Sequence, residues 1–300
     1  MVFKSPFFAL PAVLLVASCV EEVGGFEADS SSLVVIDAAL STADSTQAVY
    51  ISHGGPWTSP DVDYRWATDY DVVDTRLVTL TDDRGRVDTF DVSPNGRVCT
   101  LLRPDLEVGR TYRLDVVVGD RKFHAEQTVR PRPLVKGIKF QPMVAEKDGA
   151  EYWVPILFFD DAEPGATNYY LIHKPFSNSY SRTGRALWDI EATVLSDANL
   201  GEAVEGLRLA KGLGEYEQEQ SVWVRITYGG WFSYALSSVS REVYDYYFAM
   251  RLQLMSDGGN YMPNPSSPRT NFVGDDVQGL FVVADTYVFS GVMDYMYILQ

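Results

Sequence analysis

Cysteine and histidine are scarce in this sequence, which has two cysteines and three histidines among 300 residues. His53, His124 and His173 have no second histidine, cysteine or paired acid at the spacing of metal ligands, and the H-E-x-x-H motif is absent. The G-x-S-x-G turn that presents a catalytic serine is absent as well. We therefore expect no cofactor, no metal centre built on histidine or cysteine, and no catalytic residue that the sequence alone identifies.

Basic residues are also few, because 25 lysines and arginines stand against 41 acids and give a formal charge of −16. Nucleic-acid binding depends on neutralising phosphates with lysine and arginine, so this balance argues against it. After residue 19, no apolar run approaches the roughly 20 residues that a membrane helix needs. The sequence therefore predicts a globular chain that is kept soluble by its acids.

The first 19 residues are typical of a bacterial lipoprotein signal. Lys4 precedes an apolar run of 11 residues, Phe7–Ala17, which is too short to span a bilayer and predicts a cleaved signal peptide, 1–18. Val16-Ala17-Ser18-Cys19 resembles a lipobox, in which small residues fit the peptidase and the cysteine thiolate accepts the lipid. We expect Cys19 to carry palmitate or related acyl chains. An ordinary signal peptide with an incidental cysteine is the alternative.

Residues 19–32 are polar and acidic, and they predict a flexible tether. A coil of about 13 residues spans roughly 20 Å. The pair Glu21-Glu22 resembles the acidic surface-export signal of Bacteroidetes lipoproteins. This resemblance implies a lipid-anchored protein of the outer membrane that faces the cell exterior, and a plain acidic linker is the alternative.

Residues 33–130 predict an immunoglobulin-like β-sandwich. The expected strands are 33–40, 47–52, 77–81, 87–92, 109–118 and 122–129. In Gly109–Val118 the apolar residues alternate with charged ones, so Tyr112 and the apolar residues after it share one face. A tyrosine that follows a glycine-led corner resembles the tyrosine corner of such sandwiches. Cys99 lies in a further alternating run, and we expect a buried thiol there.

Residues 134–300 predict a second β-rich domain, separated from the first by Pro131-Arg132-Pro133. The expected strands are 152–159, 168–174, 188–195, 222–228, 279–290 and 293–299. Arg241–Met255 instead predicts one amphipathic helix with Ser240 as its N-cap. Its expected apolar face, wide enough to lie on a sheet, contains Val243, Tyr244, Tyr247, Phe248, Met250, Leu254 and Met255. The predicted fold class is mainly β.

Short segments in a fixed order carry a family resemblance that covers essentially the whole mature chain. They are Cys19, Leu33–Asp37, Gly109–Leu114, Phe159–Asp161, Asn168–Tyr170, Val243–Tyr247, Pro263, Asn271-Phe272 and Gly279–Phe281. The set resembles a family of Bacteroidetes outer-membrane lipoproteins defined only as domain of unknown function 4249. The resemblance implies a lipoprotein often considered alongside nutrient-importing transporters, and it implies no catalytic residues.

Aromatic and acidic residues gather between His53 and Asp74. The aromatic residues are Trp57, Tyr64, Trp66 and Tyr70, and the acids are Asp61, Asp63, Asp69, Asp71 and Asp74. Loops of this length are usually functional or disordered, and exposed aromatic rings beside acids suit a sugar, a peptide or a partner protein. Asp61, Asp63, Asp69 and Asp71 could hold Ca²⁺, although the EF-hand spacing is absent. The alternative is a long hairpin whose aromatic residues belong to the core.

A second candidate group lies between Phe176 and Trp188, where Arg182 and Arg185 form a cationic spot in an acidic chain. We expect Arg182, Arg185 and Trp188 to contact a ligand, and a solvated loop is the alternative.

These observations favour a non-catalytic, surface-exposed lipoprotein of the outer membrane. We expect it to bind a nutrient or a partner through its loops, with a TonB-dependent transporter as a candidate partner. Two other classes stay open. One is a cell-surface hydrolase with an unrecognised carboxylate pair, and the other is an adhesion or scaffold protein.

Overall fold

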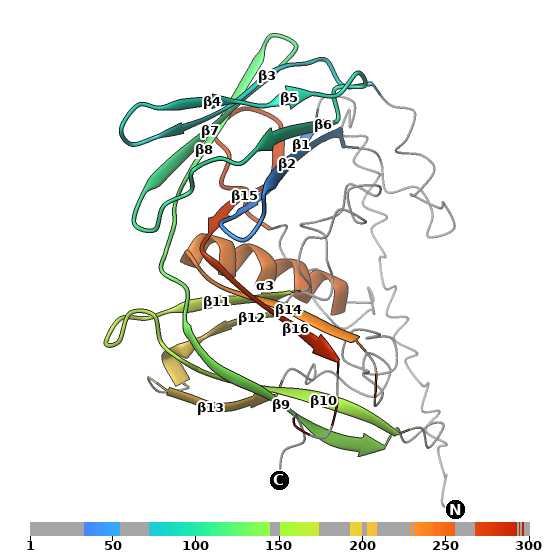
Figure 1. Ribbon diagram of the computed structural model, residues 1–300. Coiled ribbons are helices and arrows are strands. Elements are labelled where there is room, and N and C mark those ends of the chain that lie inside the picture. The colour runs from blue at the N-terminus through green and yellow to red at the C-terminus, as the bar shows by residue number, and fades with distance from the viewer. Residues whose placement is uncertain are drawn as a thin grey trace, which may run out of the picture.

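The computed structural model describes residues 33–54, 72–144, 151–173, 193–199, 203–208, 231–255 and 268–292, together with Gly229, Asp294 and Met296. Strands dominate these residues, and the helix α3 (Arg241–Met255) lies between two pairs of sheets (Figure 1). The layers follow the order sheet, sheet, helix, sheet, sheet. The predicted mainly β fold with one amphipathic helix is thus confirmed.

The first sandwich joins a five-stranded sheet of order β15-β1-β2-β6-β5 to a four-stranded sheet of order β4-β3-β7-β8. The five strands are β15 (Val277–Ala284), β1 (Val34–Ser41), β2 (Thr46–His53), β6 (Val98–Leu102) and β5 (Asp91–Val92). The four are β4 (Val87–Thr89), β3 (Thr75–Asp82), β7 (Thr111–Val118) and β8 (Arg121–Thr128). One hydrophobic core, which includes the buried Cys99, fills the space between them. Alternating burial along β7 fixes which face of that sheet meets this core.

Tyr112 forms the predicted tyrosine corner. Its ring is 4% exposed, and its hydroxyl donates to the Asp105 carbonyl and accepts from the Glu107 backbone N–H, both at 2.8 Å. Burial raises the pKa of this hydroxyl. The bonds hold the segment before β7 against its own strand, as in immunoglobulin-like sandwiches.

Strand β15 returns from the far end of the sequence to the first sandwich. It pairs in parallel with β1 over eight residues, from Val34 opposite Val277 to Ser41 opposite Ala284. The predicted division places all of 134–300 in the second domain, and the structure differs there. The near-continuous apolar run of β15 explains the difference, because both faces of this strand are buried.

The second sandwich joins a sheet of order β13-β10-β9 to a sheet of order β12-β11-β14-β16. The first contains β13 (Ala203–Arg208), β10 (Glu151–Asp160) and β9 (Leu134–Val144). The second contains β12 (Thr193–Ser196), β11 (Tyr169–His173), β14 (Trp231–Val239) and β16 (Thr286–Val292), and a 3₁₀ turn, η2 (Asp197–Asn199), follows β12. The predicted strand 279–290 is thus two strands in two sheets, separated at Asp285. The predicted strand 222–228 lies outside the described residues.

Helix α3 connects the two sandwiches through a third core. Its buried residues Val243, Tyr246, Tyr247 and Met250 contact Leu280, Val282 and Ala284 of β15 on one side and Leu171, Val194 and Val239 on the other. The predicted N-cap is confirmed, because the Val243 N–H donates to Ser240 Oγ at 3.3 Å. Among the described residues, no helix has the length and apolarity needed to cross a membrane.

Two connections between the sandwiches contact each other. One contains Arg132, between β8 and β9, and the other is Asp285, between β15 and β16. The Asp285 carboxylate accepts from the Arg132 N–H at 3.2 Å and from Thr42 Oγ1 at 2.7 Å. The Arg132 guanidinium lies 5.5 Å from the centre of the Tyr287 ring. These contacts hold the connections together at one point of the interface.

Candidate binding surface

The residues that the sequence proposes for binding lie outside the described residues. This applies to Cys19, to the loop residues Trp57, Tyr64, Trp66 and Tyr70, to the acids Asp61, Asp63, Asp69 and Asp71, and to Arg182, Arg185 and Trp188. Their positions stay predictions. The structure does place the strands from which both loops depart.

Strands β2 and β11 lead into these two loops, and both end on the right-hand side of Figure 1. Strand β1 begins on the same side, because Val34 lies opposite His53 in the antiparallel pair. Helix α3 also runs toward that side from its start at Arg241. The ends of several elements that precede or follow the candidate loops therefore share one side of the molecule.

A row of partly exposed aromatic rings follows α3 on this framework. Tyr169 of β11 lies 5.1 Å from Tyr244, measured between ring centres, and Tyr244 lies 5.8 Å from Phe248 at an interplanar angle of 14°. Phe248 is 44% exposed, and Leu252, one turn further along the helix, is 43% exposed. We call these four side chains the aromatic row.

The exposure of Phe248 corrects the predicted helix face. Tyr244 and Phe248 were expected to widen the face that packs on a sheet. Tyr244 does pack against the third core as a partly buried residue, but Phe248 is 44% exposed and does not. The fully buried residues of this face are Val243, Tyr246, Tyr247 and Met250. Residues four apart on an α-helix differ by about 40° in direction, so the series from Tyr244 to Leu252 turns progressively away from the sheets. Hydrophobicity alone could not separate these two series.

Tyr246 occupies the buried side of α3, although the sequence pattern does not assign it there. Its ring is 3% exposed, and burial, together with the nearby carboxylate of Asp37, raises the pKa of its hydroxyl. Its neighbour Tyr247 is buried beside it, with the two rings nearly perpendicular at 6.0 Å. This arrangement fixes the helix and thus the direction of the aromatic row.

Buried carboxylates of the second sandwich serve to hold a loop. Asp197 Oδ2 accepts from the Asn168 backbone N–H at 2.9 Å and from its side-chain amide at 2.7 Å. Tyr170 donates to Asp161 Oδ1 at 2.5 Å, and burial and this bond raise the pKa of the Tyr170 hydroxyl. These bonds fix the connection between β10 and β11. Among the described residues, no three acids, histidines or cysteines are grouped so as to hold a metal ion.

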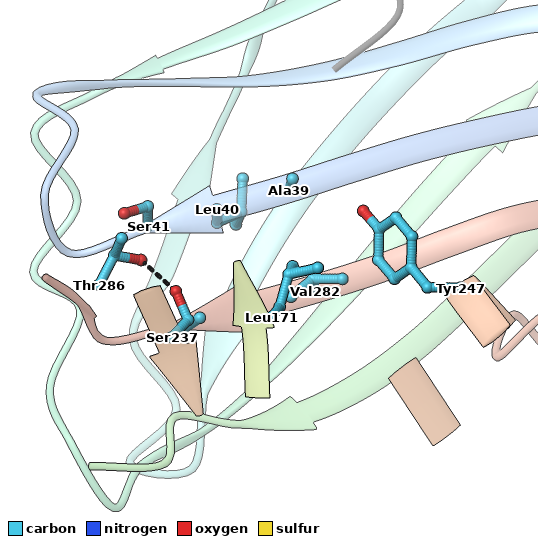
Figure 2. A pocket seen from close by; sticks show the side chains of 9 residues that line it. Ala39, Leu40, Ser41, Leu171, Ser237, Tyr247, Val282 and Thr286 are labelled. Atoms are coloured by element: carbon cyan, nitrogen blue, oxygen red, sulfur yellow. Dashed lines mark hydrogen bonds between the residues drawn. The ribbon is translucent and has the colours of Figure 1, made fainter. Parts of the chain in front are cut away.

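A small cavity lies where β1, β15, α3 and the second sandwich meet (Figure 2). It is lined by Ala39, Leu40, Ser41, Leu171, Ser237, Tyr247, Val282, Ala284 and Thr286. A hydrogen bond of 2.9 Å joins the hydroxyls of Ser237 and Thr286 beside it. Its volume of about 10 Å³ is near the minimum for one water molecule and far below that of an organic-ligand site.

Cys99 has a structural role in the first core. Its side chain is fully buried in the first core, and burial raises the pKa of the thiol to about 12. A thiol with so high a pKa carries almost no reactive thiolate at neutral pH. The expectation of a buried cysteine is therefore confirmed.

The fold is that of a mainly β protein in which an immunoglobulin-like sandwich and a second sandwich enclose one helix. The chain belongs to the family described as "Domain of unknown function (DUF4249)", whose model matches residues 25–288. No curated protein matches the sequence. The chain is similar to native alpha-2-macroglobulin from Escherichia coli spanning domains MG0-NIE-MG1, with 14% identity over 73% of this chain and 70% of that chain. The TM-score of that match is 0.21.

Proposed function

We propose that this chain is a non-catalytic, surface-exposed lipoprotein of the outer membrane that binds a nutrient or a partner protein. A TonB-dependent transporter in the same membrane is the candidate partner. The observation that carries the binding role is the aromatic row, which starts at Tyr169 of β11 and follows α3 to the exposed Phe248 and Leu252.

Aromatic side chains suit a binding surface for a physical reason. They offer a large contact area at a small cost in conformational entropy, and binding energy concentrates in a few of them. Phe248 and Leu252 expose more than two fifths of their surface without contributing to the third core. The buried side of α3 stabilises the fold. The outer side of the helix is therefore proposed to bind another molecule.

The membrane location is proposed from the sequence signals at Cys19 and Glu21-Glu22. The tether would join the folded region at Leu33, on the side where β2 and β11 end. A tether of roughly 20 Å would keep that side close to the bilayer. A partner embedded in the membrane would therefore meet the ends of β2, β11 and α3 first.

Photo-crosslinking tests the binding role. A photoreactive phenylalanine analogue at position 248 should crosslink the protein to an outer-membrane partner in intact cells, and the same analogue at the exposed Val108 should not. The proposal is wrong if both positions give the same products. If the loop between His53 and Asp74 binds the partner, Trp57→Ala/Trp66→Ala should reduce the specific crosslink while leaving the melting temperature nearly unchanged, since substitutions outside a packed core cost little stability.

Fractionation tests the anchor separately. Cys19→Ala should move the protein out of the membrane fraction, because several acyl chains at about 0.8 kcal/mol per buried CH₂ make release of the wild type negligible. Replacing Glu21 and Glu22 by alanine should protect the protein from protease added to intact cells. Unchanged membrane recovery of Cys19→Ala would exclude lipid attachment at this residue.

A further inference from the structure

The edge strands of the sheets differ in how they are protected from pairing with a further strand. In the first sandwich the Asn271 side chain bonds to both the N–H and the carbonyl of Phe281 on β15, at 2.8 and 2.7 Å. Val273 exchanges two backbone hydrogen bonds with His124 of β8. The other two edge strands, β4 and β5, have only three and two residues. Each of these devices prevents another strand from pairing with the edge.

The longest edge strand of the second sandwich is protected as well. Strand β9 contains Pro142, which has no N–H to donate, and it carries Lys136 and Lys139. Its pairing with β10 also shifts register between Phe158 and Phe159. An irregular, charged edge with a proline accepts another strand poorly.

Strand β16 has none of these features. It is an edge strand of seven residues, it contains no charged residue and no proline, and its register with β14 is regular from Thr286 to Val292. Arg132 contacts only its first part, at Thr286 and Tyr287. Within the part of the chain that the structure describes, β16 pairs with β14 alone.

The side chains of β16 also favour a strand as the occupant of this edge. Tyr287 and Phe289 face the second sandwich, where Phe289 lies 5.6 Å from Tyr234. Val288 and Val292 point the other way and are 42% and 48% exposed. A regular edge flanked by exposed β-branched residues fits an extended peptide, whose main chain can pair with the backbone groups of β16 that bond to no described strand.

We propose that the edge of β16 from Val288 to Val292 binds an extended, positively charged strand of a partner protein. The charge of the partner follows from the net charge of the chain. The chain carries a formal charge of −16, and Asp294 follows the strand, whereas Asp285 before it is paired with Arg132. Two copies of this chain would repel each other, whereas a basic strand would be attracted. This site is independent of the aromatic row and of the lipid anchor.

Hydrogen exchange of the full chain in detergent tests whether the edge is free. Every second backbone N–H of residues 288–292 should exchange nearly as fast as those of exposed turns, because only one side of β16 pairs with β14. The proposal is wrong if all of these amides are protected in the free protein. It is also wrong if protection grows with protein concentration, since that result would assign the edge to a second copy.

A synthetic peptide then tests the partner chemistry. The probe is a blocked peptide of alternating valine and threonine with lysine at each end, labelled for fluorescence anisotropy. It should bind and protect residues 288–292 from exchange. The same peptide with alternate backbone amides methylated should not bind, because it has lost the donors that pair with an edge strand.

Val288→Lys should weaken binding of the probe by about tenfold or more, by adding a like charge at the edge. Val108→Lys is the matched control, because this valine is 49% exposed and lies away from β16. Equal affinity of wild type and Val288→Lys, or protection outside β16, would overturn the assignment of this edge.

Discussion

The two sandwiches differ in how completely they are closed. The first has a single core with a tyrosine corner, and its long edges are covered by Asn271 and by the bridge at Val273. Both sandwiches pack a face against α3, but the second leaves the regular edge of β16 uncovered among the described residues. Under the two proposals above, the first sandwich supplies stability and the second supplies surfaces for other molecules.

Gly279→Ala, in the first sandwich, should cause the largest loss in the free energy of unfolding among the variants proposed below. Gly279 has φ of +109°, and an added Cβ would lie 2.0 Å from the Ile36 carbonyl oxygen, so β15 could not stay beside β1. We expect a loss above about 4 kcal/mol in the free energy of unfolding, or no folded protein at all. Gly137→Ala is the control, because nothing lies within 4 Å of its added Cβ. A thermal melt of both variants measures the difference.

Tyr112→Ala should cost about 3–5 kcal/mol, the usual effect of removing a large buried aromatic ring. Tyr112→Phe should cost only about 1 kcal/mol, since it keeps the ring and loses the two hydrogen bonds of the corner. Denaturant titration of the two variants separates packing from hydrogen bonding. Equal losses would show that the ring itself contributes little.

Asn271→Ala should have an intermediate effect, because it leaves the N–H and the carbonyl of the buried Phe281 without their partners. We expect a loss of about 1–3 kcal/mol and faster hydrogen exchange in β15. Asn271→Asp keeps the acceptor and loses the donor, so its effect should be smaller at low pH, where the carboxyl can donate. If exchange in β15 is unchanged in Asn271→Ala, this side chain does not close the edge.

Asp44→Asn should have the smallest effect, and one that depends on pH. Burial raises the pKa of the Asp44 carboxyl from 3.8 to about 6, so the folded state favours the protonated form. The stability it contributes is present below about pH 4 and is lost as pH rises through about 6. The variant should therefore melt higher than the wild type at pH 7, by no more than about 2 °C, and this gain should vanish at pH 4. A gain of equal size at both pH values would contradict the assignment.

Local patterns predicted much of this fold. Alternation along β7, the corner at Tyr112 and the cap at Ser240 each depend on neighbours in sequence, and each is confirmed. The return of β15 to β1 was missed, because pairing between residues about 240 positions apart leaves no local periodicity. The break at Asp285 was missed too, since apolar residues continue on both sides of it.

The candidate surface was harder to predict than the fold. The sequence treats Tyr244, Phe248 and Tyr247 alike, because all three are aromatic and lie at helical spacing. Their different exposure follows from where two sheets touch α3, and that is a property of the tertiary structure. The open edge of β16 likewise depends on which strands meet in space.

The parallel pairing of β1 with β15 has a consequence for the order in which the fold can form during synthesis. The first strand of the fold must wait for a partner that is made only after every described strand of the second sandwich except β16 has been translated. Neither the five-stranded sheet nor its core can be completed earlier, and such distant pairing slows folding. A chain crossing a membrane from its N-terminus would thus remain unfinished, and easily threaded, until almost all of it had passed through.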